Sequence, residues 1–371
     1  MVSAVLFITF FVLLVLNVPI SVCLGLSSAA AILYSGTSLT IVATNIYSGI
    51  SKFLLLAIPF FVLSGNIMAK AGISTRLIRF VDTCVGHRKG GIANVCIIVA
   101  CFFGAISGSG PATVAALGAV LIPAMIERGG FSAAFSTALM ATSSSIAIVI
   151  PPSIAFVVYA SITGVSIGDM FMAGIIPGIL MGLALVVVVM LEVRRNHVVP
   201  SNVEKASAKE RWNAFKDAFW GFLMPVIILG GIYGGIFTPT EAAAVSVVYG
   251  LFVGMIIYKE VKFKDLWEIL IDSAKTTGGI MLIVACASLF SFVCTRFGIS
   301  TAASELLARV AGNQFTFLLI CNIIFLIAGC FIDANSAMYI FIPIMLPVCK
   351  ALGYDVVAFG VMATVNLAIG Q

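Results

Sequence analysis

The first half of the chain contains the stretch Gly104-Ala105-Ile106-Ser107-Gly108-Ser109-Gly110-Pro111-Ala112-Thr113, set between two apolar runs. Three glycines, two serines and a proline in so short a stretch interrupt a helix, because glycine costs conformational entropy and proline lacks the amide donor. Each flanking apolar run can still form a helix. The stretch therefore predicts a helical hairpin over residues 91–127 with a broken, polar tip.

The composition places this hairpin in a membrane. Of the 371 residues, 61% are hydrophobic and 9% are charged, whereas soluble domains carry about 25% charged residues. Several apolar stretches approach the roughly 20 residues that a helix needs to cross a bilayer. Irregular backbone is tolerated at membrane depth only where protein or a wet cavity surrounds it. We therefore expect an all-α, multi-pass membrane protein in which the hairpin is re-entrant.

Charge and cysteine content exclude other classes. The net charge of +5 comes from loops, so it reports orientation in the membrane and does not indicate nucleic-acid binding. The nine cysteines form no CxxC pair, and neither a disulfide nor a cysteine metal site is expected. The sequence contains no P-loop, no GxSxG and no juxtaposed nucleophile and base, so an enzyme is not expected either.

The chain contains an internal repeat. Gly72-Ile73-Ser74-Thr75 recurs as Gly298-Ile299-Ser300-Thr301, and Gly104 then matches Gly329 at nearly the same offset. Three further pairs match in the same order: Pro123 with Pro347, Met140-Ala141-Thr142 with Met362-Ala363-Thr364, and Asn17-Val18-Pro19 with Phe237-Thr238-Pro239. Five matches in one order predict two copies of one structural unit.

The loop charges predict that the two copies are inverted. Short cytoplasmic loops carry an excess of Lys and Arg. The loop around the first copy of the repeat carries Arg76, Arg79, Arg88 and Lys89, whereas the loop around the second carries only Arg296 and Arg309. Five crossings are expected between these loops: Phe131–Thr163 (broken in the middle), Phe171–Leu191, Phe219–Phe237, Ala242–Tyr258 and Gly278–Thr295. An odd number turns the second copy over, and inverted repeats with discontinuous helices are typical of secondary transporters. A channel or a membrane enzyme on a repeated scaffold is the alternative at this point.

The predicted organisation has three parts. The first repeat covers 1–191, with scaffold spans in 1–71, the hairpin at 91–127, the broken helix at 131–163 and a span at 170–191. A cytoplasmic linker follows at 192–217. The second repeat covers 218–371, with its hairpin at about 315–350 and the start of its broken helix at 356–371. The internal symmetry predicts that a longer natural protein continues for about 50 residues beyond Gln371.

Polar residues follow the first hairpin. Thr142-Ser143-Ser144-Ser145 precedes Pro151-Pro152-Ser153, and the double proline should end the helix and leave carbonyls near Ile146–Ile148 without partners. Carbonyl and hydroxyl oxygens of this kind suit Na⁺. Half-helix N-termini at Pro111 and Pro152 would direct positive dipole ends toward an anion. The alternative is that small residues only let helices pack closely.

The second repeat carries Asp333-Ala334-Asn335-Ser336 at the matching hairpin position. An ionisable group in an apolar span is a functional hypothesis: Asp333 could ligate a cation, cap the next helix, or do both. Thr364-Val365-Asn366 and Gly370-Gln371 match the serine run in position. By contrast, Thr238-Pro239-Thr240-Glu241 predicts a capping box, which is structural.

These residues carry a family resemblance. Along essentially its whole length the chain resembles the large membrane subunit of tripartite ATP-independent periplasmic (TRAP) transporters. The resembling stretches are Leu56–Phe61, Ser107–Gly110, Ile150–Ile154, Phe171–Gly178, Phe237–Ala242 and Phe359–Met362. The family's second Thr-Pro-Pro, expected just after Gln371, lies beyond this sequence.

The resemblance implies an elevator-type transporter that symports Na⁺ with an organic acid, in the inner membrane of a bacterium. C4-dicarboxylates and sialic acid are substrates in the family, and Gly329–Ala334 leans toward the sialic acid type. Implied partners are a small membrane subunit (Q), separate or fused, and a periplasmic substrate-binding protein (P). No cofactor is implied apart from Na⁺ as the coupling ion.

The resemblance also implies site residues at the hairpin tips and broken helices. The first sodium site carries over to Ser107, Gly108, Ser109, Thr142, Ser143 and Ser144. The second carries over to Asp333, Asn335, Ser336, Thr364, Asn366 and Gly370. Substrate binding is expected at Ser109, Gly110, Ser145, Pro151 and Pro152. An ion channel built from the same broken helices is the alternative function.

Overall fold

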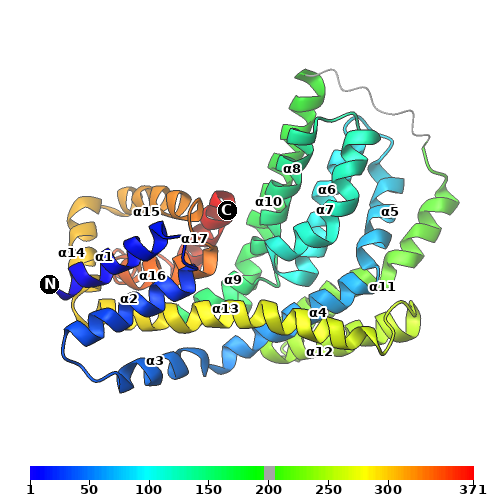
Figure 1. The fold of residues 1–371 in the computed structure, drawn as a ribbon. Coiled ribbons are helices and arrows are strands. Elements are labelled where there is room, and N and C mark those ends of the chain that lie inside the picture. Colours follow the sequence, from blue (N-terminus) through cyan, green and yellow to red (C-terminus); the bar gives the residue numbers. More distant parts are fainter. Residues whose placement is uncertain (196–204) are drawn as a thin grey trace. The chain divides into compact units, whose positions relative to one another are not determined.

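The computed structural model describes residues 1–195 and 205–371, and these residues form helices and loops without a strand (Figure 1). Seven described helices are long and apolar enough to cross a membrane, or eight if α8 (Ala133–Val149) and α9 (Ile154–Thr163) form one broken span. The prediction of an all-α polytopic membrane protein is confirmed. The expected break in the crossing over 131–163 falls between these two helices.

The described chain folds into two compact units, and each draws on both halves of the sequence. Unit 1 comprises Met1–Leu56, Ala155–Met170 and Lys275–Gln371, and unit 2 comprises Ala57–Ile154 and Phe171–Ala274. Two long helices, α10 (Ile167–Arg195) and α13 (Asp265–Arg296), pass from one unit into the other. The compact units therefore do not follow the boundary between the sequence repeats.

Unit 2 contains the first hairpin. α4 packs against α12, α5 packs against α6 and α11, and the hairpin of α6 and α7 packs on α8. The bounds are α4 (Ala57–Lys70), α5 (Ile73–Val85), α6 (Gly91–Ser107), α7 (Gly110–Glu127), α11 (Ala208–Tyr233), α12 (Pro239–Leu251) and a π-helical extension, η2 (Phe252–Ile257).

Unit 1 contains the second hairpin, formed by α15 and α16, which packs with α14 and α17. α1 packs on α2 in the same unit. The bounds are α1 (Val2–Val15), α2 (Ile20–Tyr34), α3 (Thr40–Ile50), a 3₁₀ turn η1 (Phe53–Leu56), α14 (Ile299–Ala311), α15 (Gln314–Gly329), α16 (Ala334–Ala351) and α17 (Val356–Gly370).

The repeated sequence motif begins the same element twice. Gly72 precedes α5 with φ of 68°, and Gly298 precedes α14 with φ of 70°. This left-handed conformation favours glycine because it has no Cβ. Both helices are 13 residues long, and each is followed by a hairpin and a further helix. The order α5, α6, α7, α8 thus recurs as α14, α15, α16, α17.

The predicted capping box is confirmed at the start of α12. The Thr238 amide donates to Glu241 Oε2 at 2.8 Å, and the Glu241 amide donates to Thr238 Oγ1 at 3.3 Å. Two amide donors that the helix itself cannot satisfy are thereby paired. These residues stabilise a helix end.

The predicted linker over 192–217 contains helix at both ends. α10 continues to Arg195, and α11 begins at Ala208 with Ser207 and Glu210 forming a second capping box. Residues 196–204 of the predicted linker lie outside the described part of the chain.

Candidate functional site

The first hairpin turns in a group of hydroxyls. Ser107 ends α6 and is buried, and Gly108 makes the turn with φ of 62°. Ser109 is extended and precedes α7, but its side chain makes no capping bond to that helix. Thr113 Oγ1 donates to the Ser109 carbonyl at 2.8 Å and lies 3.2 Å from Ser107 Oγ. The broken polar tip expected from the sequence is thus a compact arrangement of oxygens.

Glycines bring this tip against the end of α8. A Cβ built on Gly104 would lie 2.7 Å from the Ala147 Cα, so α6 and α8 meet backbone to backbone. A Cβ on Gly108 would lie 2.5 Å from the Pro152 carbonyl oxygen, and one on Gly110 would lie 3.3 Å from the Ser144 carbonyl oxygen. The tip therefore lies beside the residues where α8 breaks.

The break itself differs from the sequence expectation. The Ile146 carbonyl accepts from the Ile150 amide at 2.8 Å, and the Ile148 carbonyl accepts from Ser153 Oγ. The prediction that carbonyls near Ile146–Ile148 lack partners is therefore wrong for these two. The amide of Ile150 still continues the helix, and the Ser153 hydroxyl replaces the donor that is missing at Pro152.

Only part of the serine run on α8, residues 142–145, lies near the hairpin tip. The hydroxyls of Thr142, Ser144 and Ser145 each donate a hydrogen bond to a carbonyl of their own helix, at 2.9, 2.6 and 2.7 Å. Such bonds are common for Ser and Thr inside helices. Thr142 is exposed, and Ser143 is fully buried one turn before Ala147, farther from the tip.

Most of the residues predicted for the first sodium site and for substrate binding lie in one cluster, where the hairpin tip meets the break after α8. The tip residues Ser107, Gly108, Ser109 and Gly110 adjoin the break through two contacts, Gly108 with Pro152 and Gly110 with Ser144. Pro151 directly precedes Pro152 in the chain, and it is Pro152 that makes the contact. Thr142 and Ser143 do not join this group. Ser145 lies on the same helix and is partly exposed.

The second hairpin tip is built around a carboxylate. Asp333 precedes α16, and its Oδ2 accepts from the amides of Asn335 at 3.0 Å and Ser336 at 3.1 Å. Ser336 Oγ donates to Asp333 Oδ1 at 2.5 Å. Asp333 is therefore a helix cap, and its negative charge lies at the positive end of the helix dipole.

One further oxygen at this tip has no partner. Asn335 Oδ1 is buried and accepts no hydrogen bond within the described part of the chain. An unpaired buried acceptor is costly unless water or an ion satisfies it. Asp333 and Asn335 both belong to the start of α16, and carboxylate and amide oxygens are the groups that hard cations prefer as ligands.

Two residues of α17 predicted for the second sodium site, Thr364 and Asn366, make hydrogen bonds within α17 and to α15. Asn366 Nδ2 donates to Asn322 Oδ1 at 2.6 Å and to the Met362 carbonyl at 2.8 Å, which ties α17 to α15. Asn322 lies seven residues before Gly329, the last residue of α15, hence about two helical turns from the tip. Thr364 Oγ1 donates back to the Gly360 carbonyl at 2.7 Å. These hydrogen bonds of Thr364 and Asn366 lead to α15 and along α17, and none of them reaches Asp333. Asn322 was missed from the sequence, although a single amide inside the apolar stretch 315–332 is a usable signal.

Gly370 repeats the close helix contact of the first hairpin. A Cβ built on Gly370 would lie 2.8 Å from the Gly329 Cα, so α15 and α17 meet backbone to backbone. Gly104 and Ala147 make the same contact between α6 and α8. Gly104 and Gly329, which match in the sequence repeat, therefore have the same structural role: each lets the first helix of its hairpin contact the backbone of the helix that follows the hairpin.

The half-helix after the double proline is anchored within unit 1. Tyr159 OH donates to the Val356 carbonyl at 2.6 Å, and Ser161 Oγ lies 3.0 Å from Tyr339 OH on α16. Lys52 Nζ donates to the Ser161 carbonyl at 2.6 Å, and burial lowers the pKa of this amine. α9 is thus held by the second hairpin and α17, an arrangement that the sequence did not predict.

The sequence of this chain is similar to that of proteins from one known family. The family described as "Tripartite ATP-independent periplasmic transporter, DctM component" matches residues 7–371. The C4-dicarboxylate TRAP transporter large permease protein DctM of Rhodobacter capsulatus is 38% identical, over 97% of this chain and 84% of its own. The isethionate TRAP transporter permease protein DctMQ of Oleidesulfovibrio alaskensis is 39% identical, over 99% and 58%. The sialic acid TRAP transporter large permease protein SiaM of Vibrio cholerae is 36% identical, over 92% and 79%.

Proposed function

This chain belongs to the family of the DctM component of tripartite ATP-independent periplasmic transporters, and on that premise we propose that it imports an organic acid in symport with Na⁺. The transport role of the relatives points to a transporter rather than an enzyme. Their names specify C4-dicarboxylate, isethionate and sialic acid, all of which are organic anions. We propose a substrate of the sialic acid or C4-dicarboxylate class.

The tripartite family implies two partners for this multi-pass membrane protein. We propose that a small membrane subunit (Q) completes the permease and that a periplasmic binding protein (P) delivers the substrate. We propose the inner membrane of a bacterium as its location, because a periplasmic binding protein must reach the permease from the periplasm. The relative named DctMQ is consistent with a small subunit that is fused in some proteins and separate in others.

Both hairpins pack closely on the following helix through a glycine, but their tips differ in chemistry, and this contrast is the main support for symport. The second tip carries the Asp333 carboxylate and the unpaired Asn335 Oδ1, which favour a cation. The first tip has no charged residue, and no side chain caps the N-terminus of α7 at Ser109. The positive end of that helix dipole is therefore available to a substrate carboxylate.

We assign the substrate carboxylate to Ser109 and Gly110 at this helix end, beside Pro151, Pro152 and the partly exposed Ser145. One Na⁺ is proposed at the first tip, with oxygens of Ser107, Gly108, Ser109 and Ser144. A second Na⁺ is proposed at Asp333, Asn335 and Ser336. Thr364, Asn366 and Gly370 would then support the second site through the position of α17.

The close glycine contacts support an elevator mechanism. Gly104 seats α6 on α8, and Gly329 seats α15 on α17, with backbones in contact. Close backbone packing through small residues joins membrane helices tightly. Each hairpin would then move together with its helix as one rigid body, as an elevator motion requires.

The test is uptake by the full complex in proteoliposomes. Uptake of the organic acid should require both an inward Na⁺ gradient and the binding protein. Uptake that is undiminished when choline replaces Na⁺ would disprove the coupling. A steady ion current without binding protein or organic acid would instead favour the ion channel.

A further inference from the structure

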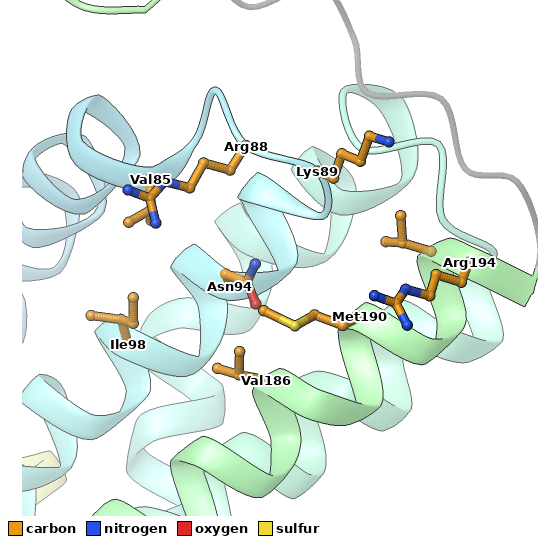
Figure 2. A pocket seen from close by; sticks show the side chains of 9 residues that line it. Val85, Arg88, Lys89, Asn94, Ile98, Val186, Met190 and Arg194 are labelled. Atoms are coloured by element: carbon orange, nitrogen blue, oxygen red, sulfur yellow. The ribbon is translucent and has the colours of Figure 1, made fainter.

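A cavity of about 410 Å³ lies in unit 2 between the end of α5, the start of α6 and the end of α10 (Figure 2). It is distant from the hairpin tip, because Asn94 precedes Ser107 by 13 residues of α6, or about 20 Å of helix. The cavity is lined by Val85, Arg88, Lys89, Asn94, Ile98, Val186, Met190, Val193 and Arg194.

The walls of this cavity change from cationic to apolar in one direction. On α10, Val186, Met190 and Arg194 are spaced four residues apart and so share a face. On α6, Asn94 and Ile98 have the same spacing. In Figure 2 the segments that carry Arg88 and Lys89 lie at the end of the cavity opposite Val186, and the Arg88 side chain ends beside Val85 while that of Lys89 points away from the cavity. Arg194 lies across the cavity from Arg88, beside Met190. A ligand that fills this cavity must combine an anionic head with an apolar body.

The cationic end fits a phosphate diester with hydroxyl groups. Arg88, Lys89 and Arg194 supply three positive charges, and none of the nine described residues that line the cavity is acidic. Asn94 Oδ1 is buried and accepts no hydrogen bond from the described residues. A head group that carries hydroxyl donors beside its phosphate would satisfy both the charges and this acceptor.

The apolar end continues onto surface that faces lipid in a membrane protein. The side chain of Met190 lines the cavity and is still 51% exposed, and on the same helix Leu183 is 57% and Val187 is 54% exposed. Contiguous exposed apolar residues on a membrane helix are in contact with acyl chains. Free phosphate would use the cations but leave the apolar walls uncovered.

We propose that this cavity binds an anionic phospholipid with a hydroxyl-bearing head group, of which phosphatidylglycerol is the simplest probe. Its phosphate lies between Arg88 and Arg194, with Lys89 adding positive charge nearby. A head-group hydroxyl donates to Asn94, and an acyl chain follows Ile98 and Val186. Basic pockets between membrane helices bind anionic head groups in this way. The proposal is independent of the substrate and of Na⁺ coupling.

The test measures lipid that remains bound to the purified full-length permease by native mass spectrometry, after exchange into mixed phosphatidylglycerol and phosphatidylcholine. The variant Arg88→Gln with Arg194→Gln should lower retained phosphatidylglycerol by about tenfold or more. Lys205→Gln with Lys209→Gln is the matched control, because both lysines are exposed and lie outside the cavity. This control should retain phosphatidylglycerol as the parent protein does.

Two further measurements complete the test. One distinguishes a phospholipid from free phosphate as the ligand, and the other uses a variant that keeps the arginines, in case the double arginine variant does not fold. Excess inorganic phosphate should fail to displace the lipid, whereas displacement would show a phosphate site instead. Val186→Trp, which keeps all charges and fills the apolar end, should also lose phosphatidylglycerol. Equal retention in the cavity variants and the control, or equal loss in both, would overturn the proposal.

Discussion

Gly108 approaches Pro152 so closely that a Cβ on Gly108 would lie 2.5 Å from the Pro152 carbonyl oxygen. The same glycine has φ of 62°, so its backbone conformation and its surroundings both exclude a side chain. This contact seats the first hairpin tip on the break in the neighbouring helix. The proposed substrate and sodium positions of the first repeat depend on it.

Gly108→Ala should therefore abolish uptake and lower the thermal unfolding midpoint of the permease. Gly353→Ala is the matched control, since Gly353 has φ of 69° but nothing lies within 4 Å of its Cβ position. That control carries only the cost of a left-handed alanine, about 1 kcal/mol, and should transport at nearly the parent rate. Equal effects of the two substitutions would show that the contact with Pro152 does not matter.

Asp333→Asn should raise the Na⁺ concentration for half-maximal uptake by about tenfold, because it removes a charge near the proposed ion. Stability should change little, since Asn caps a helix about as well as Asp and can still accept from the Asn335 and Ser336 amides. The measurement is uptake against external Na⁺ in proteoliposomes.

Asp355→Asn provides the comparison for Asp333→Asn. Asp355 caps α17 in the same way, with its Oδ1 accepting from the Ala358 amide at 2.7 Å, but it belongs to no proposed ion site. Its Na⁺ dependence should match that of the parent protein. An unaltered Na⁺ dependence in both variants would reduce Asp333 to a helix cap.

Ser109→Ala should lower uptake at least about tenfold without loss of stability, because the Ser109 side chain does not cap α7. Ser132→Ala should show the reverse. Ser132 Oγ accepts from the Phe135 amide at 3.1 Å at the start of α8, and loss of such a cap costs about 1 kcal/mol. Uptake and thermal unfolding of both variants distinguish the two roles, and full uptake by Ser109→Ala would move the substrate site elsewhere.

Asn322→Ala and Asn366→Ala should each destabilise the permease, and the double variant should be less destabilised than the sum. The amides bond at 2.6 Å between α15 and α17, and hydrogen bonds between membrane helices contribute about 1 kcal/mol. Unfolding of the four proteins gives the coupling energy. Strictly additive effects would indicate that the bond contributes no net stability.

Several features could be predicted from the sequence because they are local. Gly72 and Gly298 determine where α5 and α14 begin, since their backbone conformation favours glycine. Thr238 and Glu241 are three residues apart, so their capping box needs no distant partner. The hairpin over 91–127 followed from glycines and a proline between two apolar runs, and Asp333 at the second tip was recognised by its charge.

Other features required contacts that sequence spacing does not encode. The serine run on α8 is polar in sequence, but the helix rotates Thr142 to an exposed side and Ser143 into a buried one. Ser153 satisfies the Ile148 carbonyl, which reversed an expectation drawn from the prolines alone. The Asn322–Asn366 bond joins residues 44 positions apart, and only packing shows it.

Hydrophobicity, helix breakers and caps act over a few residues, so the sequence alone was enough to predict a multi-pass helical membrane protein with two repeated hairpins. Which oxygens meet at each tip became clear from the packed helices alone. That choice depends on the rotation of each helix about its axis and on the close backbone contacts at Gly104, Gly108 and Gly329. The same holds for the cavity beside Asn94, whose walls come from segments about 90 residues apart and acquire their polarity gradient only when α6 and α10 pack side by side.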